Sequence, residues 1–172
     1  MTRIGRWLPR TLVVIGAVAL AGCGFHLRKE ATLPPSMAKV HLDVADPLSP
    51  LARDLKKALP RSGTVVVDKA EPGVAVLQIP VSTFTTDVLT VSGTARASEY
   101  QIRYHVEFSV QDAAGAMIVP HQVIELSRDF TFDASQALGV GPEQDLLKQE
   151  LERDMVETLL RRLEVLGQAA AH

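Results

Sequence analysis

The sequence predicts an α+β fold: a two-layer sandwich of two helices packed on one face of a mixed β-sheet, in the order β-α-β-β-β-β-α. Two observations support this prediction most strongly. Residues 99–111 alternate between polar and apolar side chains, which is typical of a strand with one solvated and one buried face. Between residues 143 and 166, leucines and one methionine recur at mostly four-residue spacing, which predicts a helix with one apolar side. Each one-sided element needs the other to cover its apolar surface.

A β-α-β unit is expected to begin the domain. Residues 39–44 alternate as a strand, and residues 64–68 form a β-branched run that predicts a second, short strand. Between them, Ser49 is a helix N-cap before a proline, and leucines at every fourth position predict a helix over residues 50–59 that Pro60 stops. Because the two strands are joined by a helical crossover, they should lie parallel in one sheet.

A long β-rich region follows, over residues 74–89. Pro80 lies inside it and cannot donate a ladder hydrogen bond, so we expect an edge or bulged strand. A small polar tip at residues 91–97 then leads into the alternating strand at 99–111. Residues 112–115 turn the chain, and residues 123–132 form the last predicted strand.

One charge interrupts the apolar side of that last strand. Arg128 is expected to be either a buried charge that needs a partner or a side chain facing a neighbour at the end of the sheet. Residues 139–143 should open the final helix, with acidic residues in its first turn. We expect Gly167 to end this helix and residues 168–172 to form a frayed tail.

The N-terminal region reads as a secretory signal. Three arginines precede an apolar run of eleven residues, and the small residues before Cys23 resemble the cleavage box of bacterial lipoproteins. We therefore expect a cleaved signal at residues 1–22, a lipidated tether at 23–37 and one domain at 38–167. The apolar run is too short to span a bilayer, which needs roughly 20 residues. The alternative is an ordinary signal peptide that contains a cysteine.

The composition restricts the compartment and the partners. Gly24, and not aspartate, follows Cys23, which by resemblance to enterobacterial sorting favours the outer membrane. Removal of three signal arginines from totals of 18 basic and 20 acidic residues leaves a net charge of about −5, which argues against general nucleic-acid binding. Cys23 is the only cysteine, so an acylated chain forms no disulfide.

No catalytic, metal or cofactor motif is present in the sequence. The five histidines lack metal-ligand spacing, and we expect them to be solvated. The acidic residues of the final helix alternate with basic ones and predict a solvated face with ion pairs. The sequence contains neither a nucleophile elbow nor a complete phosphate-binding glycine motif. We therefore predict that the protein is not an enzyme.

Several strings along the mature chain resemble the LptE family of lipopolysaccharide-assembly lipoproteins. They are Cys-Gly-Phe-His-Leu-Arg at 23–28, Ala-Ser-Glu-Tyr-Gln-Ile-Arg-Tyr at 97–104, Gln-Ala-Leu at 136–138 and Leu-Arg-Arg-Leu at 160–163. The resemblance implies a non-enzymatic domain that sits in the lumen of the outer-membrane barrel LptD as a plug, one copy per barrel. It further implies that the pair inserts lipopolysaccharide into the outer leaflet.

The resemblance also implies site residues. Arg96 matches a basic position credited with lipopolysaccharide contact, and Arg103 is a second candidate, although we expect it to pair with an acid on its own strand. The chain has no charge near Val140, where the family carries another basic residue, which favours the plug role. The expected partner interface comprises Ser92, Gly93, Thr94, Arg96, Glu99, Gln101 and Arg103. The alternative is an independent lipoprotein that binds a small amphiphile or peptidoglycan in a cavity.

Overall fold

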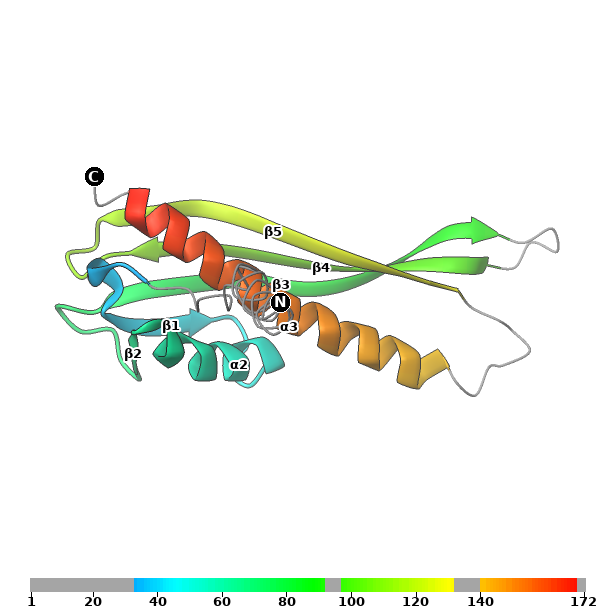
Figure 1. Cartoon of the computed structure of the whole chain (residues 1–172), viewed down its shortest axis with the longest axis horizontal. Helices are drawn as coiled ribbons and strands as arrows, with labels where there is room; N and C mark the ends of the chain where they lie inside the picture. Colours follow the sequence, from blue (N-terminus) through cyan, green and yellow to red (C-terminus); the bar gives the residue numbers. More distant parts are fainter. Residues whose placement is uncertain (1–32, 92–96, 132–139, 170–172) are drawn as a thin grey trace, which may run out of the picture. The chain divides into compact units, whose positions relative to one another are not determined.

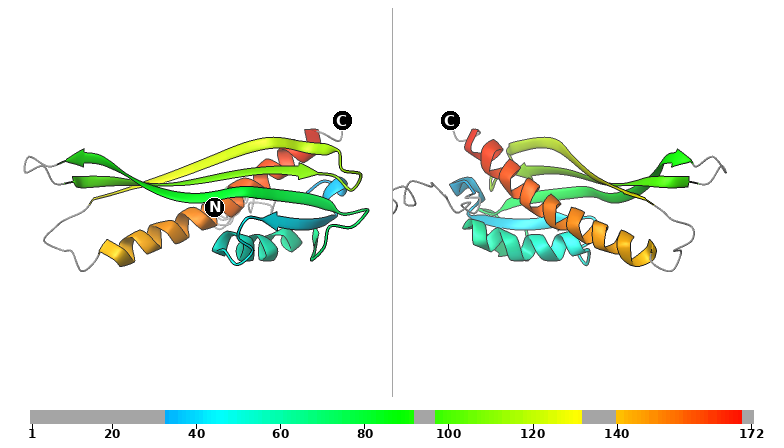
Figure 2. Two further views of the ribbon diagram at one scale, coloured as in Figure 1. Left: turned by 180° about the vertical axis from the view of Figure 1, so that it is seen from behind. Right: turned by 45° about the vertical axis from the view of Figure 1, so that its right-hand side comes forward.

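Five strands form one sheet in the order β2-β1-β3-β4-β5, and two α-helices lie on the same side of it (Figures 1 and 2). This computed structural model describes residues 33–91, 97–131 and 140–169. The described residues all belong to one compact unit that begins at Ala31. The predicted two-layer architecture and element order are confirmed.

The β-α-β unit forms as the local signals predict. Strand β1 (Lys39–Val44) pairs parallel with β2 (Val65–Val67) and also parallel with β3. Helix α2 (Pro50–Ala58) begins at a Ser49 cap, whose hydroxyl accepts a hydrogen bond from the Ala52 amide at 3.2 Å. A short 3₁₀ helix, η2 (Leu59–Ser62), follows α2 and contains Pro60.

The rest of the sheet is a three-stranded antiparallel meander. It consists of β3 (Ala75–Val91), β4 (Ala97–Gln111) and β5 (Met117–Thr131). Strand β5 begins at Met117, earlier than the predicted start at residue 123. A register shift opposite Phe108 and Val110, beside Pro120, breaks the alternation that would have marked these first residues as a strand.

Pro80 marks a change in the pairing of β3. The ladder with β4 shifts register between Gln78 and Val81, and the ladder with β1 ends at the Val44–Ile79 pair. The predicted bulge is therefore present. The predicted edge is present as well, because β3 has no β1 partner from Pro80 onward, although β3 lies between β1 and β4 before that residue.

The core lies between the sheet and helix α3 (Val140–Ala169). The predicted stripe on α3 is confirmed, because Leu151, Met155, Leu159 and Leu163 are fully buried and Leu147 and Leu166 pack against them. The β4 side chains that face this layer are also buried: Ile102, Tyr104, Val106, Phe108 and Val110.

Gly167 does not end α3, contrary to the prediction. The helix continues to Ala169, and Gly167 is a point of close contact, because an added Cβ would lie 2.5 Å from Cγ of Pro34. The start of the packed unit also differs from the predicted boundary at residue 38. Leu33, Pro34 and Met37 are buried, and the Leu33 amide donates a hydrogen bond to the Ser62 carbonyl at 3.2 Å.

Candidate functional site

The face of β3, β4 and β5 that points away from the helices is polar and forms the candidate site. Residues paired directly across an antiparallel ladder share a face, so the register assigns the members of this surface. We call it the open face, and it comprises Gln78, Val81, Thr83, Thr85, Asp87, Thr90, Glu99, Gln101, Arg103, His105, Glu107, Ser109, Val123, Glu125, Ser127, Asp129 and Thr131. The β4 members are only partly buried or exposed, whereas their neighbours on the helix side are almost all fully buried.

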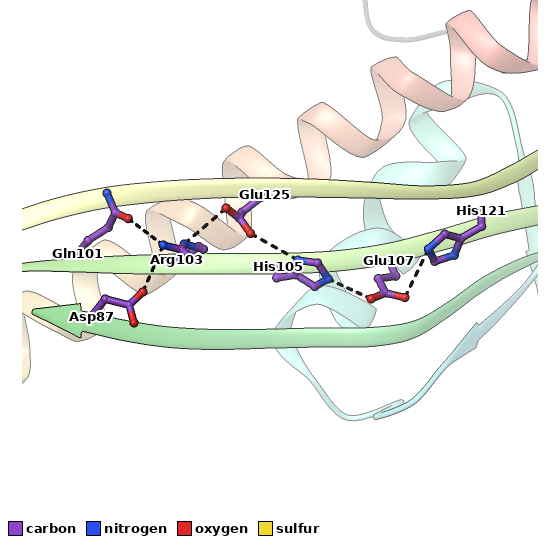
Figure 3. A network of polar contacts seen from close by, with 7 residues as sticks. All are labelled: Asp87, Gln101, Arg103, His105, Glu107, His121 and Glu125. Carbon is purple, nitrogen blue, oxygen red and sulfur yellow. Dashed lines mark hydrogen bonds and ion pairs between the residues drawn. The ribbon is translucent and has the colours of Figure 1, made fainter.

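Arg103 lies at the centre of the open face and bridges three strands (Figure 3). Its Nη2 lies 3.3 Å from Asp87 Oδ2 on β3, and its Nε lies 3.4 Å from Glu125 Oε1 on β5. The prediction that Arg103 pairs with an acid on its own strand is therefore wrong. The register places Thr85 and Ser127 directly opposite Arg103. Asp87 and Glu125 are therefore its diagonal neighbours, which a long side chain can reach. On β4 itself the alternate neighbours of Arg103 are Gln101 and His105, and neither is an acid.

Two histidines extend this row of charges. His105 contacts Glu107 through Nε2 at 3.0 Å and Glu125 through Nδ1 at 3.5 Å, and His121 lies 3.5 Å from the second oxygen of Glu107. The hydrogen bond to Glu107, with a further contribution from Glu125, raises the pKa of His105 above its usual range. His105 is partly buried and hydrogen-bonded, which corrects the sequence-based expectation for it, whereas His121 is exposed as expected.

The expected interface residues that the structure describes lie together on this face. The Gln101 amide donates to Asp129 Oδ1 at 2.9 Å, and the Thr90 hydroxyl donates to Glu99 Oε2. Ser92, Gly93, Thr94 and Arg96 lie outside the described residues, as does Cys23. The structure thus brings Glu99, Gln101 and Arg103 onto one surface.

The open face is acidic. Its carboxylates belong to Asp87, Glu99, Glu107, Glu125 and Asp129, and Arg103 is its only arginine. Two of these carboxylates already contact the guanidinium of Arg103. A phosphate approaching Arg103 would have to displace them and would meet like charge around it. The arrangement therefore favours hydrogen bonding to a polar protein surface over binding of an anion at Arg103.

Arg128 lies on the opposite, helix-covered side of β5. Its Nη2 donates a hydrogen bond to Asp154 Oδ2 of α3, and its Nη1 donates to the Ser127 carbonyl at 3.0 Å. Both side chains of the ion pair are a little more than two-fifths exposed, at 42% and 45%. Arg128 is thus a partly buried charge with a partner, and it connects the sheet to α3.

Aromatic side chains stack in pairs on the helix-covered side of β3, β4 and β5. The sequence did not predict these pairs. The rings of Phe84 and Tyr104 are stacked with centroids 4.0 Å apart, and those of Tyr100 and Phe130 are stacked at 5.3 Å. The Tyr104 hydroxyl lies 2.8 Å from the Ser82 hydroxyl, and burial raises the pKa of Tyr104 to about 12. The only signal in the sequence was the presence of aromatic residues at alternating strand positions.

These features define a one-sided α+β domain that presents a long polar sheet face. In the described ranges, no three His, Asp or Glu side chains are grouped to hold a metal ion, and no helix is long and apolar enough to cross a bilayer. The model of the LptE family, described as lipopolysaccharide-assembly, matches residues 37–163. The chain belongs to the LptE family, whose members are lipopolysaccharide-assembly lipoproteins.

Curated relatives match most of the chain. An LPS-assembly lipoprotein LptE of Yersinia enterocolitica is 31% identical over 159 residues, which cover 92% of this chain and 76% of that protein. Another from Pectobacterium atrosepticum is 32% identical over 155 residues, covering 89% of this chain and 83% of that protein.

Solved structures share the fold. A solution structure of lipoprotein B from Nitrosomonas europaea aligns with a TM-score of 0.72 at 27% identity, over 86% of this chain and 94% of that one. The crystal structure of the rare lipoprotein B from Shewanella oneidensis has a TM-score of 0.69 at 24% identity, over 78% of this chain and 99% of that one.

Proposed function

We propose that this protein is an outer-membrane lipoprotein, anchored through an acylated Cys23, that plugs the lumen of an LptD-like barrel. One copy per barrel would assist the assembly of lipopolysaccharide at the cell surface. The names of the curated relatives, LPS-assembly lipoprotein LptE, support the pathway. The open face is the observation that supports the docking role.

A plug must present polar groups, because the interior of an outer-membrane barrel is polar. The open face meets this requirement, and its one arginine, Arg103, already has two carboxylate partners on its own domain. A partner would have to supply hydrogen-bond donors or cations to the excess carboxylates, such as those of Glu99 and Asp129. Within the described residues, these two side chains accept hydrogen bonds only from Thr90 and Gln101, respectively. Polar, internally paired surfaces of this kind suit a large, wet interface.

The dimensions of the hairpin support the same proposal. Strands β4 and β5 each contain 15 residues, which corresponds to roughly 50 Å at about 3.4 Å per residue. A bilayer with its headgroups is about 40–45 Å thick. The meander is long enough to follow a barrel lumen from one side of the membrane to the other.

Direct lipopolysaccharide contact belongs to Arg96 in this proposal. Lipid A phosphates suit arginine through paired, charge-assisted hydrogen bonds. The carboxylates around Arg103 give it a different role, in which it orders the partner-facing surface. Arg96 lies in the short segment between β3 and β4, away from this row along the sequence.

Co-purification tests the proposed partnership. The acylated protein, extracted from outer membranes in mild detergent, is expected to elute in a stoichiometric complex with a large barrel protein. An Asp87→Arg, Glu125→Arg variant should weaken this complex, because it reverses two charges on the open face. A matched variant, Asp54→Arg with Glu157→Arg, places the same changes on the helix layer and should retain the complex. Purification of the wild-type protein alone would favour the independent-binder alternative.

A further inference from the structure

We infer that the C-terminal half of α3 and the adjoining part of β5 form a contact site for the anionic phospholipid headgroups of the anchoring membrane. The inference rests on the proposed anchoring through Cys23. The site is a shallow groove of about 460 Å³. Its lining residues are Gln122, Thr158, Arg161, Arg162, Val165 and Leu166.

The groove combines cationic and apolar side chains. Two guanidinium groups and two aliphatic side chains line it, and no carboxylate does. Val165 is 66% exposed, so an accessible aliphatic side chain borders the two guanidinium groups. Arginine pairs well with phosphate, and exposed aliphatic groups gain free energy at the boundary between headgroups and acyl chains. An anionic phospholipid offers both features in one molecule.

Two acidic side chains lie near these arginines on α3 but outside the groove. Glu157 lies one turn before Arg161 with a contact of 4.0 Å, at the limit of an ion pair and more than half exposed. Glu164 follows on the same helix and is half-buried. Neither lines the groove. Such exposed pairs contribute little free energy, so Arg161 can exchange its partner for a lipid phosphate.

The groove lies beside the first described residues, from which the chain leads back to the proposed anchor. Gly167, one residue beyond the groove, lies against Pro34, where the described unit begins. Pro34 is eleven residues after Cys23 in the sequence, a separation that cannot exceed about 40 Å even for an extended chain. The sequence between them contains Arg28 and Lys29, which an anionic surface would also attract.

Other basic residues gather at the same end of the described unit. In Figure 1 the C-terminal ends of α2 and α3 lie on the left, together with the helix η1 (Pro35–Met37). The C-terminal end of β3 and the start of α3 lie on the right. The last turn of α2 carries Lys56 and Lys57, and η2 carries Arg61. The turns at this end also carry Asp68, Glu71 and Asp112, so the lipid contact is assigned to the arginines of the groove and not to the whole end of the domain.

A spin label at position 165 tests the inference, because an acylated Cys23 leaves Val165→Cys as the only free thiol. The mature acylated protein is placed in phosphatidylcholine vesicles with or without phosphatidylglycerol, together with a trace of nickel-chelating lipid. The electron spin of the label at 165 is expected to relax faster when phosphatidylglycerol is present, because contact with the membrane brings the label close to the nickel-chelating lipid. A label at Val88→Cys, on the far part of the hairpin, should not respond.

Charge variants show whether the arginines cause the contact. Arg161→Gln with Arg162→Gln should lower the membrane-contacting population roughly ten- to thirty-fold, because each of the two cations strengthens binding to an anionic surface several-fold. Lys148→Gln with Arg153→Gln removes the same charge from the same helix and should leave the relaxation unchanged. Circular dichroism checks that each variant is folded.

Two results overturn the inference, and they are distinguishable. If the protein floats with vesicles but the label at 165 ignores phosphatidylglycerol, or the Arg161, Arg162 variant behaves like wild type, the lipid site is wrong and the anchoring stands. If the wild-type protein fails to float with any vesicle, the proposed anchoring is wrong and the lipid site fails with it.

Discussion

Gly167 and Pro34 lie in direct contact, and the glycine has no room for a side chain. A Cβ at position 167 would lie 2.5 Å from Cγ and 3.0 Å from Cδ of Pro34. The contact fixes the first described residues of the chain against the end of its last helix. Any pull on the segment that leads to Cys23 would therefore act on a packed joint and not on a free linker.

Gly167→Ala should destabilise the protein by about 1–3 kcal/mol, because the added methyl group must displace a rigid proline ring. Gly141→Ala is the matched control, since nothing lies within 4 Å of an added Cβ near the start of the same helix. That control should be neutral or slightly stabilising. Urea unfolding of the two variants measures the difference, and equal stabilities would show that the Pro34 contact is not tight.

Leu159→Ala should lower the free energy of unfolding by about 2–5 kcal/mol, because Leu159 is fully buried between α3 and the sheet. Val165→Ala on the exposed side of the same helix should change it by less than about 0.5 kcal/mol. Denaturant titration compares the two. An unchanged unfolding midpoint for Leu159→Ala would mean that the wrong face of α3 has been assigned to the core.

His105 should make stability depend on pH. Its folded-state pKa is raised by Glu107 and Glu125, so its contribution is fully present below the unfolded value near 6.5 and is lost as pH rises through the folded pKa. His105→Gln should remove this part of the pH dependence. NMR titration of the ring, with unfolding curves at several pH values, checks it. A His105 that titrates below 6.5 would contradict the hydrogen bond to Glu107.

Arg96→Asp separates the ligand role from the docking role. Reversing this charge opposite a lipid A phosphate should weaken lipopolysaccharide binding, while association with the barrel survives. Lys57→Asp makes the same reversal on the exposed surface of α2 and should leave both unchanged. Photocrosslinking to labelled lipopolysaccharide measures the first property and co-purification the second. Unchanged binding in Arg96→Asp would make Arg96 an ordinary solvated side chain.

Local periodicity was sufficient to predict most of the fold. The α3 stripe, the Ser49 cap and the alternation of β4 each depend on residues close in sequence, and the structure confirms all three. The bulge at Pro80 was also predictable, because the lack of an amide donor is a property of the residue itself.

The features that the sequence left wrong or open involve contacts between distant segments. The role of Gly167 depends on Pro34, and the partner of Arg128 is Asp154 on another element. Arg103 was assigned an acid on its own strand because the register of the neighbouring strands cannot be read from one strand alone. The contact of His121 with Glu107 could not be predicted for the same reason, since His121 lies in the irregularity of β5 between the Val110–Val119 and Phe108–Gln122 pairs.

Site-specific photocrosslinking in cells tests the plug proposal most directly. Photoreactive residues at Gly93, Arg96 and Arg103 sample the segment between β3 and β4 and the centre of the open face, and one at Lys57 samples the helix layer. The proposal predicts adducts with an LptD-like barrel from the first three positions, stronger than from Lys57. No barrel adduct from any of the three would contradict it.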